Sequence, residues 1–252
     1  MIDIKDVRRS FAGHPVLNGV NLTINTGETT VIIGRSGCGK SVLLKHIIGL
    51  LKPDSGHILI NGKDVTKMDE KELSALRMKF GMLFQGAALF DSLDVFENVA
   101  FSMIEHTAID RATMEKRVKE CLSLVGLKGI EKKKPAELSG GMRKRVGLAR
   151  AIARWPQIML YDEPTTGIDP IMGDAINDLI LDLHNKLKVT SIAVTHDMTS
   201  AYKIADRIAM LYKGRIIAVG TPEEIKGTKD PIVKQFVTGA SKGPITEGED
   251  LS

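Results

Sequence analysis

The chain has 252 residues, of which 43% are hydrophobic and 26% charged, a composition typical of a globular protein rather than a disordered or fibrous one. Its net charge of +4, from 35 basic and 31 acidic residues, is too balanced for a dedicated nucleic-acid binder. Its apolar stretches are too short to span a bilayer and its N-terminus is unlike a signal peptide, so we expect at most a peripheral membrane role. Its two cysteines, Cys38 and Cys121, are too few for a disulfide framework, which indicates a reducing cytosol.

The first thirty residues alternate apolar and polar side chains, a pattern that predicts short antiparallel strands. Residues 29–33 form a β-branched run that predicts a buried strand, and residues 41–51 are compatible with a helix. The segment between them therefore lies at the N-terminus of a helix, where backbone N–H groups favour anions.

That segment, residues 34–41, reads G-R-S-G-C-G-K-S and matches the phosphate-binding loop G-x-x-x-x-G-K-[S/T]. Its glycines allow the backbone N–H groups to form a concave nest for phosphate oxygens. Lys40 supplies a positive charge for the outer phosphates, and Ser41 offers a hydroxyl to Mg²⁺. We expect Cys38 to be a small residue that fits the loop, with a redox switch as the less favoured alternative. The predicted nucleotide-binding residues of the loop are Gly34, Arg35, Ser36, Gly37, Cys38, Gly39, Lys40 and Ser41.

The middle of the chain changes from strands to helices. Residues 57–60 followed by Asn61-Gly62 predict a strand and a tight turn, and residues 80–84 predict a strand that ends at Gln85. From there to about Trp155 the pattern is helical, with one apolar stripe at helical spacing formed by Met114, Val118, Cys121, Leu122 and Val125.

Strands return in the second half, at residues 158–161, 190–194, 207–211 and 215–219, with an amphipathic helix over about 170–186. Strands separated by helices predict parallel crossovers and an α/β sheet. We assign residues 1–85 and 156–226 to a catalytic core and residues 86–155 to a helical insert. Residues 227–252 form a C-terminal extension with a short helix after Pro231, and from Gly239 composition predicts disorder.

Two acidic residues follow the apolar strand at 158–161. Asp162 is placed to hold Mg²⁺, directly or through water. Glu163, one residue further, is placed to accept a proton from an attacking water molecule. The following residues, P-T-T-G-I-D-P, make this pair more specific than an ordinary strand end.

Residues 138–142, L-S-G-G-M, open a basic helix and resemble the signature of the ATP-binding-cassette (ABC) ATPases. The resemblance implies an α/β fold, with a RecA-like phosphate-loop core, an N-terminal antiparallel β subdomain and an inserted α-helical subdomain. It also implies ATP and Mg²⁺ as ligands. In this family two cassettes pack head to tail, so Ser139, Gly140 and Gly141 of one copy contact the ATP that the other copy holds. The chain is therefore expected to act as an ATPase in a homodimer.

The same resemblance assigns roles to residues outside these motifs. Phe11 resembles the aromatic residue that stacks on adenine, with an ordinary core phenylalanine as the alternative. Gln85 is similar to the glutamine that contacts Mg²⁺ or the attacking water and senses the membrane partner. Asp169 matches the loop that crosses to the other subunit, and His196 the switch histidine that hydrogen-bonds the γ-phosphate.

A finer resemblance rests on residues 83–101, the E-H-T at 105–107, the methionine that ends L-S-G-G-M, and D-P-I-V-K-Q-F-V near the C-terminus. These resemble the ATPase subunits of the Mla (maintenance of lipid asymmetry) family. The resemblance implies phospholipid traffic between membranes, together with an MlaE-type permease, an MCE-domain lipid-binding protein and, in some members, a STAS-domain regulator. It places the chain on the cytoplasmic face of the bacterial inner membrane, with a C-terminal extension that crosses the ATPase dimer.

Two other functions stay open at this point. One is the ATPase of a small-solute importer, and the other is a soluble ABC protein that acts on DNA or ribosomes. The second is disfavoured because the chain has neither long coiled coils nor a second cassette, and we expect no nucleic-acid partner. The apolar run at residues 86–90 beside Gln85 is the expected contact with the membrane partner, with a buried loop as the alternative reading.

Overall fold

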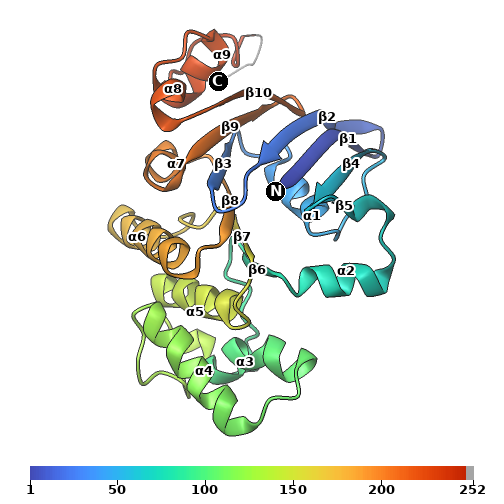
Figure 1. Cartoon of the computed structure of the whole chain (residues 1–252). Helices are drawn as coiled ribbons and strands as arrows, with labels where there is room; N and C mark the ends of the chain where they lie inside the picture. The colour runs from blue at the N-terminus through green and yellow to red at the C-terminus, as the bar shows by residue number, and fades with distance from the viewer. Residues whose placement is uncertain (248–252) are drawn as a thin grey trace.

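The computed structural model describes residues 1–247 and has an α/β architecture with two sheets (Figure 1). The larger sheet has six strands in the order β10-β9-β3-β8-β7-β6. Strands β6, β7, β8, β3 and β9 run parallel, and β10 is antiparallel at one edge. The strands are β3 (Thr29–Ile33), β6 (Phe80–Leu83), β7 (Ile158–Asp162), β8 (Thr190–Thr195), β9 (Arg207–Tyr212) and β10 (Arg215–Gly220).

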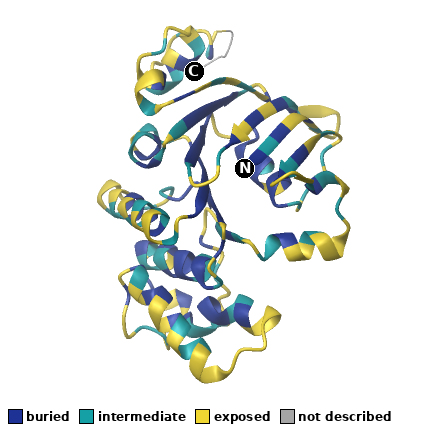
Figure 2. Cartoon of the chain, in the orientation of Figure 1, coloured by how far each residue is buried: buried dark blue, intermediate teal, exposed yellow. Residues whose placement is uncertain are grey.

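Both faces of this sheet are buried, which explains why every residue of β3 and β7 is buried and most of them are apolar. Val31 and Ile33 of β3 pack into the core on the helical side, whereas Ile32 packs into the core on the other side. Side chains of consecutive strand residues point to opposite faces, so one short strand contributes to both cores. The dark blue central strands in Figure 2 show this double burial.

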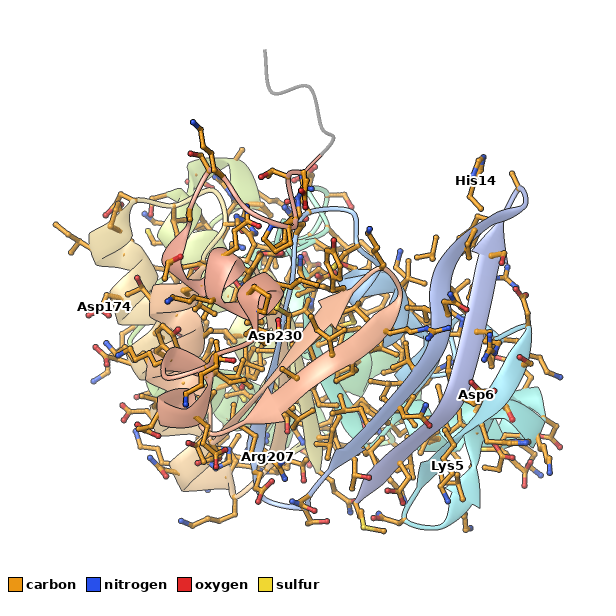
Figure 3. All side chains as sticks on the ribbon, turned by 90° about the horizontal axis from the view of Figure 1, so that it is seen from above. Lys5, Asp6, His14, Asp174, Arg207 and Asp230 are labelled. Carbon is orange, nitrogen blue, oxygen red and sulfur yellow. The ribbon has the colours of Figure 1, made fainter. Side chains whose placement is uncertain are left out.

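The smaller sheet is antiparallel, in the order β2-β1-β4-β5, and consists of β1 (Ile2–Phe11), β2 (His14–Ile24), β4 (Ser55–Ile60) and β5 (Lys63–Asp64). Asn61 and Gly62 both have positive φ, 49° and 81°, as the expected tight turn between β4 and β5 requires. Seen from above, Lys5 and Asp6 of β1 lie on the opposite side of the molecule from Asp174 of α6 (Figure 3).

Helices surround the sheets. Helices α3, α4 and α5 lie together at the bottom of Figure 1, below the carboxyl end of β6. No helix in residues 1–247 is both long and apolar enough to cross a membrane. The helices are α1 (Lys40–Ile47), α2 (Glu70–Arg77), α3 (Val95–His106), α4 (Arg111–Leu124), α5 (Gly140–Ile152), α6 (Pro170–Leu187), α7 (Met198–Ile204), α8 (Pro222–Lys226) and α9 (Pro231–Thr238), with short 3₁₀ turns at Val65–Lys67 and Pro135–Glu137.

Two segments differ from the sequence prediction. Helix α1 ends at Ile47 and not near residue 51, because Gly49 is left-handed (φ 67°) and the Arg77 guanidinium bonds the carbonyls of Ile48 and Gly49. Residues 239–247 form turns where composition predicted disorder, because the buried amide of Gln235 bonds Ala240, Ile245 and Thr246. Residues 248–252 of the predicted extension lie outside the described part.

The close packing of β6 on α5 gives a stability prediction. A Cβ on Gly81 would lie 2.4 Å from the Ala151 carbonyl oxygen and 2.5 Å from the Met159 sulfur. We expect Gly81→Ala to lower the free energy of unfolding by about 1–3 kcal/mol, measured by chemical or thermal denaturation. Gly86→Ala is the matched control, since a Cβ there meets nothing within 4 Å. Equal stability of the two variants would contradict this packing.

Candidate nucleotide-binding site

The phosphate loop links the end of β3 to the start of α1, as predicted, and its glycines are sterically required. Gly34 has φ 156°, and a Cβ there would lie 2.4 Å from the Leu211 carbonyl oxygen of β9. Gly39, with φ 105°, precedes the first residue of α1, and a Cβ there would lie 3.0 Å from Val16 Cγ1 of β2. The loop is therefore confined against both sheets in a conformation that only glycine adopts without strain.

A pocket of about 270 Å³ lies beside this loop. The phosphate loop follows β3, Gln85 follows β6, Glu163 follows β7 and His196 follows β8. Ligands of open α/β sheets bind where the carboxyl ends of parallel strands meet, and this pocket is at such a place. It is lined by Ser36, Gly37, Gly39, Lys40, Ser41, Val42, Gln85, Glu163 and His196.

Two oxygen-bearing side chains meet at the start of α1. The Ser41 hydroxyl donates to Asp162 Oδ1 at 2.7 Å, although the two residues are 121 positions apart. The alternation of side chains along β7 explains this contact. Ile158 and Leu160 of β7 face the core that contains α1, and Asp162 continues the same alternation. A hydroxyl and a carboxylate at one point are ligands that suit Mg²⁺.

Glu163 lies at the centre of a charged cluster. Its Oε1 is 3.3 Å from Lys40 Nζ, and this pair is buried, with 9% and 5% of the two side chains exposed. Its Oε2 is 2.9 Å from His196 Nδ1 and accepts a hydrogen bond from the Thr166 hydroxyl at 3.2 Å. Lys40 also donates to the carbonyls of Gly34 and Arg35, at 2.8 and 3.1 Å.

The cluster therefore brings together Lys40, Glu163 and His196, three side chains that the sequence assigned to the same site. A carboxylate bonded to a histidine, with a lysine ammonium beside it, can orient a water molecule and stabilise developing phosphate charge.

The signature residues lie outside this pocket. Ser139 is exposed and caps α5, accepting a hydrogen bond from the Met142 N–H at 3.3 Å. Asp169 caps α6 in the same way, from the Met172 N–H at 3.0 Å. Neither these two residues nor Gly140 and Gly141 line the pocket beside the phosphate loop. The predicted contact of Ser139, Gly140 and Gly141 with ATP would therefore need a second copy of the chain.

Phe11 lies outside the phosphate loop and Cys38 lies within it, and neither lines the pocket beside the loop. Phe11 is partly exposed, and the Arg9 guanidinium lies over its ring at 4.8 Å from the centroid. Pro15 and Val16 of β2, the strand that pairs with the strand of Phe11, line a second pocket with Arg35, Ser36, Gly37 and Cys38 of the loop. Burial raises the pKa of the Cys38 thiol despite the nearby Lys40, which favours the reading of Cys38 as a small packing residue over a redox switch.

Sequence reasoning missed the roles of two basic residues of α5. Lys144 and Arg150 were expected on a basic helix, yet both contact the segment after β6. Lys144 donates to the carbonyls of Gln85 and Glu163, and Arg150 to those of Ala87 and Ala88. No pattern in the sequence separates them from exposed basic residues of α5 such as Arg143.

The strand order and the pocket define a phosphate-loop nucleoside triphosphatase. The chain belongs to the ABC transporter family, whose model matches residues 17–166. It is 34% identical to an ATP-binding cassette solved as a dimer in a post-hydrolysis state with ADP and Pi, with a TM-score of 0.80 over 88% of this chain and 99% of that one. The predicted cassette fold and ATPase class are thereby confirmed.

Two relatives of the chain are named for the transport of different substrates. The chain is 43% identical to the probable ribonucleotide transport ATP-binding protein mkl of Mycobacterium leprae (strain TN), over 99% of this chain and 72% of the relative. It is 38% identical to the intermembrane phospholipid transport system ATP-binding protein MlaF of Escherichia coli (strain K12), over 97% of this chain and 91% of the relative. The resemblance to the Mla family is confirmed.

The charged cluster predicts the effect of one isosteric change. Glu163→Gln removes the carboxylate that contacts Lys40 and His196, and we expect ATP turnover to fall about 100- to 1,000-fold. Binding of ATP should persist, because the phosphate loop is unchanged. The measurements are steady-state ATPase rates and size-exclusion chromatography with ATP, where a stable dimer is expected.

The matched control is Glu137→Gln, which makes the same change on an exposed residue outside the pocket. Turnover of Glu163→Gln at the rate of this control would show that Glu163 is not the general base.

Proposed function

We propose that the chain is the ATP-hydrolysing subunit of an Mla-type complex that moves phospholipids between membranes. The observation that carries the proposal is the full-length similarity to MlaF, combined with a pocket in which every predicted catalytic side chain is present. MlaF is named for intermembrane phospholipid transport, and the Mla resemblance of residues 83–101 lies in the segment that joins this pocket to α3. Small-solute transport is the alternative, favoured by the ribonucleotide name of mkl.

In this proposal Glu163 orients and deprotonates the attacking water, and His196 donates to the γ-phosphate. Gln85 lines the same pocket and would contact the water or the metal. The Lys40 ammonium and the backbone N–H groups of the phosphate loop bind the phosphates, while Phe11 stacks on adenine. Phosphoryl transfer needs mainly such positioning and charge neutralisation.

The site would be completed by a second copy of the chain. Ser139, Gly140 and Gly141 of one copy, at the N-terminus of α5, would bind the γ-phosphate held by the other copy, where the backbone N–H groups favour anions. Asp169 would lie in the loop that crosses the interface. The exposure of Ser139 and its absence from its own chain's pocket support this arrangement, as does the dimeric state of the similar solved cassette.

The oxygen ligands beside the phosphate loop fit Mg²⁺. Ser41 and Asp162 would hold the ion, and Gln85 lies on the same pocket. Bound there, Mg²⁺ would neutralise charge on the β- and γ-phosphate oxygens. The chain's own contribution is to keep the hydroxyl and the carboxylate together.

We predict that Asp162→Asn raises the Mg²⁺ concentration for half-maximal ATPase activity about 10- to 100-fold. The reason is that the amide keeps the shape of the side chain but removes its charge. The measurement is a Mg²⁺ titration of ATPase activity at saturating ATP. Asp182→Asn, on the exposed face of α6, is the control. An unchanged Mg²⁺ midpoint would contradict the assignment of Asp162.

A surface next to Gln85 supports the proposed contact with a membrane permease. Phe84, Phe90 and Ile104 are exposed, and the ring of Phe90 lies 4.6 Å from that of Phe101 on α3. Buried Asn98 fixes the backbone of this segment, because its amide bonds both the N–H and the carbonyl of Phe90. A rigid segment with exposed aromatic side chains is typical of a binding surface.

The structure shows which residue of this segment is the better probe of the contact. Leu89, within the apolar run predicted from sequence, packs against the core, so a charge there would test folding as well as binding. Phe90 is 43% exposed and is the better probe. The proposed partners are an MlaE-type permease, an MCE-domain lipid-binding protein and, in some complexes, a STAS-domain regulator. These place the chain peripherally on the cytoplasmic face of the bacterial inner membrane.

We predict that Phe90→Ser weakens binding of the membrane subunit about 10- to 30-fold, the loss expected for a central aromatic contact. The ATPase rate of the isolated chain should stay within about twofold, since Phe90 does not line the pocket. The measurements are affinity for the permease in nanodiscs and ATP-dependent lipid transfer. Val219→Ser, an exposed apolar residue on β10, is the control.

Unchanged permease binding in Phe90→Ser would rule out this surface as the contact. Isolation of the native complex, followed by identification of its membrane subunits and bound lipid, tests the cargo directly. Recovery of a solute permease without phospholipid would favour the alternative suggested by the name of mkl.

A further inference from the structure

Helix α5 carries a buried ammonium group that the ATPase mechanism above does not use. Lys144 is 5% exposed, and its Nζ donates to the Gln85 carbonyl and, at 3.3 Å, to the Glu163 carbonyl. Burial lowers the pKa of Lys144, while the nearby Asp162 and Glu163 oppose that shift. A lysine held at this depth needs strong partners, and these two carbonyls belong to the backbone of two proposed catalytic residues.

Arg150, nearly two turns further along α5, makes a parallel contact. Its guanidinium donates to the carbonyls of Ala87 and Ala88, at 2.7 and 2.6 Å. Gly147 lies between the two basic residues on the same face of the helix. A Cβ on Gly147 would lie 3.2 Å from the Ala87 Cβ, so the glycine allows the segment after β6 to approach closely.

The backbone positions that these basic residues hold are conformationally unfavourable. Glu163, Ala87 and Ala88 have φ of 48°, 61° and 48°, in the left-handed region that L-residues avoid. Each such residue costs about 1–2 kcal/mol and persists only where its surroundings fix it. The Glu163 N–H donates to the Val194 carbonyl at 3.0 Å, so β8 fixes one side of this residue and Lys144 the other.

The same helix begins at the signature. Ser139 caps α5, and Lys144 follows five residues later, within one rigid helix. Any displacement of the signature therefore moves Lys144 with it. Since Lys144 contacts both the Gln85 and the Glu163 backbone, a displacement of α5 reaches the carboxylate that faces Lys40 and His196.

We propose that Lys144 is a positioning residue, which couples the position of the signature helix to that of Gln85 and Glu163. This inference rests on the proposed function of Glu163 in ATP hydrolysis. Without the ammonium group, the Glu163 backbone loses one of the contacts that hold its left-handed conformation, and its carboxylate leaves the position that orients water. ATP binding is spared, because Lys144 does not line the pocket of the phosphate loop.

The test is Lys144→Met in the full chain, which removes the charge and keeps the length of the side chain. We expect kcat for ATP hydrolysis to fall about 10- to 100-fold, as for a small misplacement of a catalytic group, with KM within about twofold. Lys144→Arg, which restores a cationic donor, should recover most of kcat. Lys119→Met, the same change on an exposed lysine of α4, is the matched control.

Thermal unfolding of each variant separates positioning from stability. A kcat of Lys144→Met equal to that of Lys119→Met would overturn the proposal. So would a loss of kcat that Lys144→Arg does not recover, or one explained by unfolding at the assay temperature. If Lys144→Met does not fold, Lys144→Gln, whose amide can donate to one carbonyl, replaces it with the same expected split between kcat and KM.

Glu163→Gln, measured in parallel, separates this inference from the proposed function. A fully active Glu163→Gln would refute the role of Glu163 itself. An inactive Glu163→Gln beside a fully active Lys144→Met would refute only the role of Lys144.

Discussion

The buried ion pair between Lys40 and Glu163 holds the phosphate loop against the segment that follows β7. Removing two charges from water costs several kcal/mol per ion, so a buried pair persists only where further hydrogen bonds compensate. Here Lys40 has two carbonyl partners in the phosphate loop, and Glu163 has His196 and Thr166. The Lys40–Glu163 and Glu163–His196 contacts join segments that follow different strands, so they fix the relative positions of the ends of β3, β7 and β8.

This arrangement depends on the doubly buried sheet. Because the carboxyl ends of its parallel strands meet at one edge, short loops from four strands reach one pocket without any long connection. Consecutive side chains at the end of β7 point in different directions and contact different groups. Asp162 faces Ser41 on the α1 side, while Glu163 turns through a positive φ toward Lys40. Two adjacent carboxylates thus contact different groups of one site.

Much of this was predictable from the sequence, because the relevant signals are local. The β-branched run at residues 29–33, the glycines of the phosphate loop and the Asn61-Gly62 turn each specify their own backbone. The end of α1 depends on Gly49, which is a local signal, and on Arg77, whose contact could not be predicted because it is distant in sequence. The turns of residues 239–247 likewise depend on Gln235, a single buried amide within a polar segment.

The burial of Lys144 and the partial burial of Arg150 were the least predictable features, and their cause is the shape of the surface that faces α5. Basic residues are mostly exposed, so a sequence pattern predicts exposure for them. It gives no information on which backbone carbonyls lie close enough to accept their hydrogen bonds. Those carbonyls can accept from α5 because left-handed residues at 87, 88 and 163 take the backbone out of regular strand and helix bonding. Strain in the loops and burial of basic side chains therefore explain each other. The loops can keep an unfavourable conformation because α5 supplies donors, and α5 can bury charge because the loops present acceptors.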